Sequence, residues 1–148
     1  TKQLLGEMQD SNAYISAIKE ISPVPITFEP LSDNINGYYH PKEKKIVVNS
    51  TISSIQKVKT LFHELTHALL HTPKDSKPHK DLHTKEIEAE SVAYTVLKHY
   101  GYDTSDYSFG YIADWSKTKE LNEFKESIDT IVSTSNQIIK ELDTVLLN

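Results

Sequence analysis

One stretch near the middle of the chain decides its fold: Thr60-Leu61-Phe62-His63-Glu64-Leu65-Thr66-His67-Ala68-Leu69-Leu70-His71. Apolar residues in and just before this stretch recur three and four residues apart, which predicts an amphipathic helix. Ser53 and Gln56 have the spacing of a capping box before the first of them, and Thr72-Pro73 follows the last. We therefore expect a helix over about 53–71 whose apolar face is formed by Ile55, Val58, Leu61, Phe62, Leu65 and Leu69.

This helix carries the pattern H-E-x-x-H at His63, Glu64 and His67. Residues four apart on a helix point the same way, so the two imidazoles can hold one metal ion. Glu64 lies between them, where it can accept a proton from water whose pKa Zn²⁺ lowers toward about 7. The pattern predicts His63 and His67 as zinc ligands and Glu64 as a general base. The alternative is a pair of surface or capping histidines.

A catalytic zinc ion usually has three protein ligands, so a third ligand must come from elsewhere in the chain. A helical wheel for a second predicted helix, at about 84–100, places Glu86 and Glu90 inside the apolar arc and Glu88 outside it. A buried carboxylate is costly unless it is paired or holds a metal. We expect one of Glu86 and Glu90 to be the ligand and the other to orient a histidine. The wheel does not say which, and the alternative is that both bond buried hydroxyls or a lysine.

Three further histidines are candidates for the third ligand. His71 lies four residues after His67 and can share its face, but we expect it to help end the helix, where a cation is favoured. His79 and His83 fall in a predicted loop over 73–83. We expect these two side chains to be solvated, with a place in a cleft as the alternative.

The rest of the chain indicates an α+β domain. Apolar spacing predicts a first helix that begins near residue 4 and ends before Ser22-Pro23. A short strand over 26–28 and a hairpin over 37–49 follow it, and a long amphipathic helix over 121–146 ends the chain. We expect this last helix to pack on the core, with binding of a partner as the alternative. Three aromatic residues are expected in the core, with a tyrosine donor to an oxyanion as the alternative: Tyr107, Tyr111 and Trp115.

Composition narrows the class of protein. The chain has 148 residues, enough for one domain, and its net charge of −5 argues against nucleic acid as a partner of this domain alone. No apolar run exceeds three residues, so we expect neither a membrane span nor a signal peptide. Cysteine is absent, which excludes disulfides and cysteine-bound zinc and favours a cytoplasmic location. Because the chain begins with Thr1, we expect residues 1–148 to be one domain cut from a longer protein.

Three stretches together resemble the ImmA/IrrE group of zincin metallopeptidases: the helix quoted above, Glu86-Ile87-Glu88-Ala89-Glu90-Ser91-Val92-Ala93-Tyr94, and the segment 103–113. Within that group they are most similar to the metallopeptidase domain of ArdC/LtrC-like proteins, which are carried on plasmids and conjugative elements. The hairpin at 37–41 and the segment 22–26 fit the same group. The resemblance therefore covers nearly the whole chain.

The resemblance implies a gluzincin-type zincin fold, with a small sheet packed on the active-site helix and on a glutamate-bearing helix. Gluzincins use the pattern E-x-x-x-[DE], which falls here on Glu86 and Glu90. It therefore implies that Glu86 is the third zinc ligand and that Glu90 orients a histidine. It also implies one Zn²⁺ per chain and a protein or peptide as substrate.

We expect a cytoplasmic zinc metallopeptidase domain of a mobile-element protein, which hydrolyses peptide bonds with Glu64 as base. An edge strand of the hairpin is expected to hold the substrate backbone. One alternative is a metal-bound module that binds proteins, or acts in antirestriction, without cleaving them. Another is a structural metal site closed by a fourth ligand from His71, His79 or His83. The sequence does not predict an oligomeric state.

Overall fold

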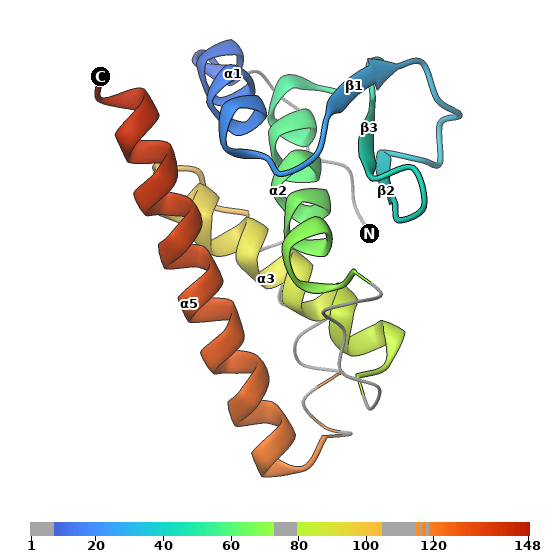
Figure 1. Ribbon diagram of the computed structural model, residues 1–148, viewed down its shortest axis with the longest axis vertical. Coiled ribbons are helices and arrows are strands. Elements are labelled where there is room, and N and C mark those ends of the chain that lie inside the picture. The colour runs from blue at the N-terminus through green and yellow to red at the C-terminus, as the bar shows by residue number, and fades with distance from the viewer. Residues whose placement is uncertain (1–7, 73–79, 105–114, 116, 118) are drawn as a thin grey trace.

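The computed structural model describes residues 8–72, 80–104, 115, 117 and 119–148. Helices and a small sheet make up this part of the chain, and their arrangement is shown in Figure 1. In chain order the elements are α1 (Ser11–Ile21), β1 (Ile26–Glu29), β2 (Gly37–His40), β3 (Lys45–Asn49), α2 (Ser54–Leu70), α3 (Leu82–His99) and α5 (Leu121–Leu146). The predicted α+β class, with a small sheet and a long C-terminal helix, is confirmed.

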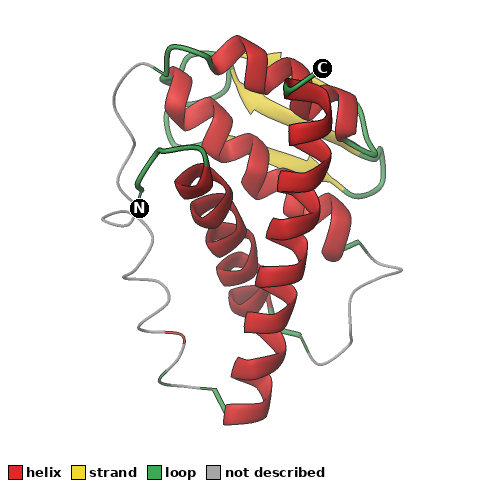
Figure 2. Cartoon of the chain, turned by 90° about the vertical axis from the view of Figure 1, so that its left-hand side faces the viewer, coloured by secondary structure: helices red, strands yellow, loops and turns green. Residues whose placement is uncertain are grey.

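Helix α2 lies at the centre of the molecule, in contact with the sheet, with α1 and with α3 (Figures 1 and 2). The backbone N–H of Gln56 donates to the Ser53 hydroxyl at 3.3 Å, so the helix begins at the predicted cap. Leu61, Phe62 and Leu65 on its apolar face are buried in the core. Burial of this face anchors α2 and leaves its polar face directed at α3.

The sheet has three strands in the order β1-β3-β2, with β1 parallel and β2 antiparallel to β3. The central strand is apolar and buried at Ile46, Val47 and Val48. Strand β2 lies at an edge of this sheet and packs against α2. A Cβ at Gly37 would lie 2.7 Å from the Val47 oxygen and 2.8 Å from Thr60 Cγ2. Glycine therefore allows β2 to approach the central helix closely.

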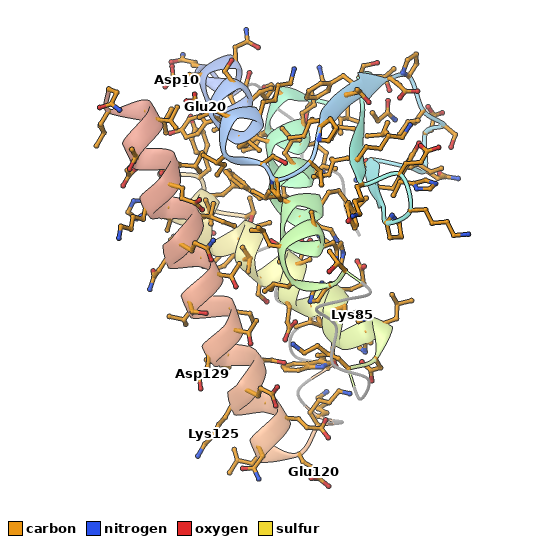
Figure 3. The ribbon with its side chains drawn as sticks, in the orientation of Figure 1. Asp10, Glu20, Lys85, Glu120, Lys125 and Asp129 are labelled. Carbon is orange, nitrogen blue, oxygen red and sulfur yellow. The ribbon has the colours of Figure 1, made fainter. Side chains whose placement is uncertain are left out.

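Helix α3 begins at Leu82, and its N-cap is Asp81, whose side chain accepts a hydrogen bond from the Thr84 backbone N–H at 2.7 Å. The sequence analysis did not predict this cap. The helix ends at His99, one residue before the predicted end, and Gly101 follows with a φ of +95°. Helix α5 packs on α1 and α3 along its length. Its outer face carries exposed charged side chains, and those of Lys125 and Asp129 point away from the body of the molecule (Figure 3).

Several expectations need correction or fall outside the described ranges. Helix α1 begins at Ser11, and Met8 is buried in a described segment, 8–10, that is not helical, so the helix does not run on from near residue 4 as predicted; residues 1–7 lie outside the described residues. Apolar spacing does not distinguish a helix from an irregular segment that packs on the same core. Trp115 is buried as predicted, and its indole N–H donates to the Thr84 hydroxyl at 3.0 Å. Tyr107, Tyr111 and His79 lie outside the described residues. None of the described helices has the combination of length and apolar character that a membrane crossing requires.

The close packing of β2 on α2 predicts that Gly37→Ala destabilises the protein by about 1–3 kcal/mol, as overpacking does elsewhere. The cost is measured by urea unfolding. Thr60→Ser removes the Cγ2 methyl that a new Cβ would meet. The double variant should therefore lose less stability than the sum of the two single variants. Strict additivity would show that this contact does not limit the approach of β2.

Candidate functional site

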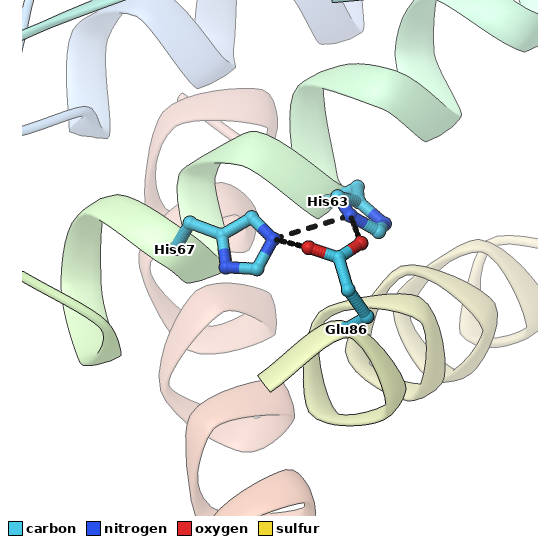
Figure 4. A group of neighbouring side chains, drawn as sticks. All are labelled: His63, His67 and Glu86. Atoms are coloured by element: carbon cyan, nitrogen blue, oxygen red, sulfur yellow. Dashed lines mark hydrogen bonds and ion pairs between the residues drawn. The ribbon is translucent and has the colours of Figure 1, made fainter. Parts of the chain in front are cut away.

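Side chains from α2 and α3 converge at one point, as Figure 4 shows. The Nε2 atom of His63 lies 3.0 Å from one carboxylate oxygen of Glu86, and the Nε2 atom of His67 lies 2.9 Å from the other. The two Nε2 atoms are 3.3 Å apart. The structure thus brings together both histidines of the H-E-x-x-H pattern and the third ligand that the resemblance implied.

The three side chains fit a divalent metal. One atom from each lies within 4.8 Å of the other two, and among the described residues no other group of this kind is found. Ligands bonded to zinc at 2.0–2.1 Å in a tetrahedron are about 3.3 Å apart, close to the separation of the two imidazole nitrogens. The Nδ1 atoms of His63 and His67 both bond other side chains, which leaves the two Nε2 atoms facing each other.

A buried ion pair contacts the Nδ1 side of the His63 ring. Its Nδ1 atom lies 3.1 Å from a carboxylate oxygen of Glu90, whose other oxygen contacts the Lys59 ammonium. Burial alone would raise the pKa of Glu90, but His63 and Lys59 lower it to about 2. Glu90 is therefore a carboxylate, and the structure places it where it orients the His63 ring.

His67 is held through a second histidine. Its Nδ1 atom is 2.8 Å from Nδ1 of His71, and Nε2 of His71 is 2.8 Å from a carboxylate oxygen of Glu88. The other oxygen of Glu88 contacts Lys80 Nζ and the Ser127 hydroxyl, each at 2.9 Å. His71 also ends α2, since it is the C-cap residue as the sequence predicted. Burial lowers the pKa of its ring, although the contact with Glu88 opposes this effect.

The helical wheel was wrong about Glu88. Its side chain is 0% exposed, whereas that of Glu86, placed by the wheel inside the apolar arc, is 43% exposed. The physical reason is that α3 packs against α2 on one side and against α5 on another, so it has no single buried arc. Hydrogen bonds from His71 and Ser127 and the charge of Lys80 hold the pKa of Glu88 below its usual range, against the effect of burial.

The sequence analysis did not identify three partners of the buried glutamates: Lys59, Lys80 and Ser127. A signal was present for Lys59, because residues 59, 63, 67 and 71 are spaced by four and form one polar column on α2. Such a column inside a helix interface calls for carboxylates on the facing helix. No sequence signal points to Ser127, which reaches the site only because α5 packs on α3.

Glu64 lies beside the three converging side chains and is 9% exposed. Burial raises the pKa of its carboxyl group and Glu86 adds to the rise, while His63 and His67 oppose it. The carboxylate accepts a backbone hydrogen bond from Tyr39 in the edge strand β2. The edge of the sheet therefore helps to orient the residue that the sequence predicted as a base.

The charges around His63 favour a cation. Burial alone would lower the pKa of this imidazole, but the carboxylates of Glu86 and Glu90, with that of Glu64 nearby, raise the pKa to about 10. Hydrogen bonds from His63 and His67 hold the pKa of Glu86 well below its usual range. Positive charge is thus stabilised at the point where the two Nε2 atoms and the Glu86 carboxylate meet.

Two cavities open on either side of this point, with volumes of about 350 Å³ and 420 Å³. Both are lined by His63, Glu64, Leu82 and Glu86. The first extends along α2 and includes His83, in keeping with the alternative that placed this histidine in a cleft. The second follows the edge strand and is lined by Gly37, Tyr38, Tyr39 and Pro41, among others. The converging side chains are thus accessible from two sides.

The chain is similar to known proteins. The chain is 37% identical over 100 residues to an uncharacterised protein of Bacillus anthracis, a match that covers 67% of this chain and 17% of that protein. The Mn(II)-bound crystal structure of the antirestriction protein ArdC from the R388 plasmid aligns with a TM-score of 0.60 at 19% identity, covering 100% of this chain and 56% of the other. At that identity the likeness establishes a shared fold.

The chain therefore spans about a sixth of the first relative and just over half of the second. Residues 20–105 match the family model for the IrrE N-terminal-like domain, named Peptidase M78. This matched region contains the H-E-x-x-H pattern and the three glutamates of α3. The chain is a metallopeptidase-like domain that belongs to the IrrE N-terminal-like family.

Proposed function

We propose that this domain is a zinc-dependent peptidase of the gluzincin type, in which His63, His67 and Glu86 hold one Zn²⁺ per chain and Glu64 is the general base. The observation that carries the proposal is the convergence of the two Nε2 atoms and the Glu86 carboxylate between two cavities, with Glu64 lining both. Open space on both sides of the ligands suits a substrate whose chain passes across them.

Zn²⁺ bound at these ligands would lower the pKa of water toward about 7 and polarise a substrate carbonyl. Glu64 takes the proton of the attacking water while the oxygen bonds to the peptide carbon. The same carboxyl group then gives that proton to the amide nitrogen as the C–N bond breaks. Its raised pKa favours uptake of the proton from water, and the Tyr39 backbone N–H keeps one of its oxygens in place.

The edge strand β2 is the element that holds the substrate. It lies at the edge of the sheet and lines the second cavity, so an extended peptide can add to it by backbone pairing. Leu82, which is 74% exposed, lines both cavities and offers an apolar contact to a substrate side chain. An extended peptide or an unfolded protein segment is therefore the substrate class that this cleft fits.

Zinc is the metal that we assign to the centre. Two imidazoles and one carboxylate form the donor set of several catalytic zinc sites, whereas Mn²⁺ favours oxygen donors. The structure of ArdC is described as Mn(II)-bound, so both metals belong in any binding experiment.

Replacement of Glu86 tests the metal site. Glu86→Gln removes the only anionic ligand, and we expect zinc content to fall from one ion per chain to a small fraction of that value. Mass spectrometry of protein purified without chelators measures the content. Glu123→Gln, on the outer face of α5 with a half-exposed side chain, is the matched control and should keep its zinc. One zinc per chain in Glu86→Gln would refute the assignment of this ligand.

Replacement of Glu64 tests the catalytic step. Glu64→Gln should keep its zinc but lower kcat by about 10²–10⁴-fold, the usual contribution of a general base. Cleavage of a mixed peptide library, followed by mass spectrometry, measures the rate. An antirestriction assay in cells separates the alternative, in which the domain binds proteins without cleaving them. Full antirestriction by the zinc-loaded Glu64→Gln variant would favour that binding role over the peptidase.

Replacement of Tyr38 tests the substrate strand. This residue lines the second cavity and is 38% exposed, so its ring is available to a bound peptide. Tyr38→Ala should raise KM about fivefold with kcat nearly unchanged, the result of losing about 1 kcal/mol of uniform binding. The exposed Ile35→Ala, outside both cavities, serves as control. Unchanged kinetics of Tyr38→Ala would rule against substrate binding along β2.

A further inference from the structure

Glu88 is buried close to the metal ligands, yet the proposed reaction does not use it. Its side chain is 0% exposed and receives three partners: the His71 ring, the Lys80 ammonium and the Ser127 hydroxyl. A carboxylate is kept in such a place only when these partners compensate its lost hydration. The His71 ring on one of its oxygens is also the ring that contacts the ligand His67.

We propose that His71 and Glu88 form a relay that positions His67 as a metal ligand, and that α5 supports this relay through Ser127. The proposal rests on the proposed function, because it requires a metal at His67. Both nitrogens of the His71 ring are engaged, one with His67 and one with Glu88, and neither residue belongs to the group of converging ligand atoms, so both act through His67 as positioning residues.

The direction of each hydrogen bond follows from the carboxylate. Glu88 can only accept, so the His71 ring donates to it through Nε2–H. A neutral His71 ring then has an unprotonated Nδ1, which accepts from Nδ1–H of His67 at 2.8 Å. His67 is left with its Nε2 lone pair directed toward His63 and Glu86, as a metal ligand requires.

The two ligand histidines are thus supported in different ways. His63 bonds a carboxylate directly, whereas His67 reaches its carboxylate through one intervening imidazole. The ring centroids of His67 and His71 are 5.0 Å apart, so the second carboxylate lies one ring farther from the centre than Glu90. The relay therefore orients His67 without placing another negative charge against the metal.

The relay also gives α5 a part in the site. The match to the family model ends at residue 105, and α5 lies beyond it at 121–146. Ser127 on this helix is buried and donates to Glu88 at 2.9 Å. The C-terminal helix, which we expected to pack on the core with binding of a partner as the alternative, thus reaches the metal ligand His67 through the side chains of Glu88 and His71.

Zinc affinity of the full chain, measured by competition with a chromophoric chelator, tests the relay. His71→Phe keeps a ring but removes both hydrogen bonds, and we expect the Kd for zinc to rise about 10–100-fold, as for other residues that orient a ligand. His71→Gln retains an acceptor and a donor and should recover part of this loss. His99→Phe is the matched control, because His99 lies at the far end of α3 and, among the described rings, contacts only Tyr100.

A serine pair on α5 tests the contribution of that helix. Ser127→Ala should raise the Kd for zinc a few-fold. Ser135→Ala, which removes a buried hydroxyl without a hydrogen-bond partner among the described residues, should leave it unchanged. The Co²⁺ absorption spectrum adds a readout that general destabilisation does not move, since its d–d bands report ligand geometry. We expect these bands to shift in His71→Phe and to stay in place in Ser135→Ala.

Each outcome decides between the relay and its absence. Wild-type affinity and an unchanged Co²⁺ spectrum in His71→Phe would overturn the relay while leaving the metal site intact. A wild-type chain that binds neither Zn²⁺ nor Co²⁺ would overturn the metal site and the relay together. If His71→Phe does not fold, the comparison of His71→Gln and Ser127→Ala with Ser135→Ala decides, and equal affinities in all three would overturn the proposal.

Discussion

Burial of carboxylates between α2 and α3 is the constraint on which the rest of the site depends. A carboxylate withdrawn from water without a partner costs several kcal/mol, and removal of one partner from a buried pair costs about 3–5 kcal/mol. Helix α2 meets this requirement with a column of basic side chains spaced by four residues, and α3 faces it with three glutamates within five residues. The facing sets are Lys59, His63, His67 and His71 on α2, and Glu86, Glu88 and Glu90 on α3.

Glu86 differs from the other two glutamates of this interface in its ion-pair partners. Glu88 and Glu90 are both buried. Glu88 forms an ion pair with Lys80, and Glu90 forms one with Lys59. Their charges are therefore neutralised locally. Glu86 has no lysine partner among the described residues, stays partly exposed and is shared between the two Nε2 atoms. Its charge is the one that remains for a metal ion, so the same interface can serve both for packing and for the proposed metal site.

The sheet adds a second requirement, which is closeness to α2. Only a residue without a side chain fits where β2 passes Thr60, and Gly37 occupies that position. The approach allows the Tyr39 backbone N–H to reach Glu64 and leaves a cavity along the edge strand. The positions of the proposed base and of the surface proposed to hold the substrate therefore depend on one contact between strand and helix.

Much of the fold and of the site could be predicted from local patterns. The spacing of four between His63 and His67 brings two imidazoles together on any helix. The cap at Ser53 and the hairpin were also predictable, because they too depend on residues close together in the sequence. The start of the first helix was wrong, because Met8 is buried without being helical. Periodicity reports that a residue is buried and does not report which backbone conformation buries it.

The sequence by itself determined the H-E-x-x-H face and the helix that presents it, because these depend on residues within one or two turns. Only the tertiary structure decided which glutamate is buried and what each one meets. Glu88 was misplaced because a wheel assumes one buried side, whereas α3 packs on α2 and on α5. The contact with Ser127 joins residues 39 positions apart, and only the packing of α5 brings them together.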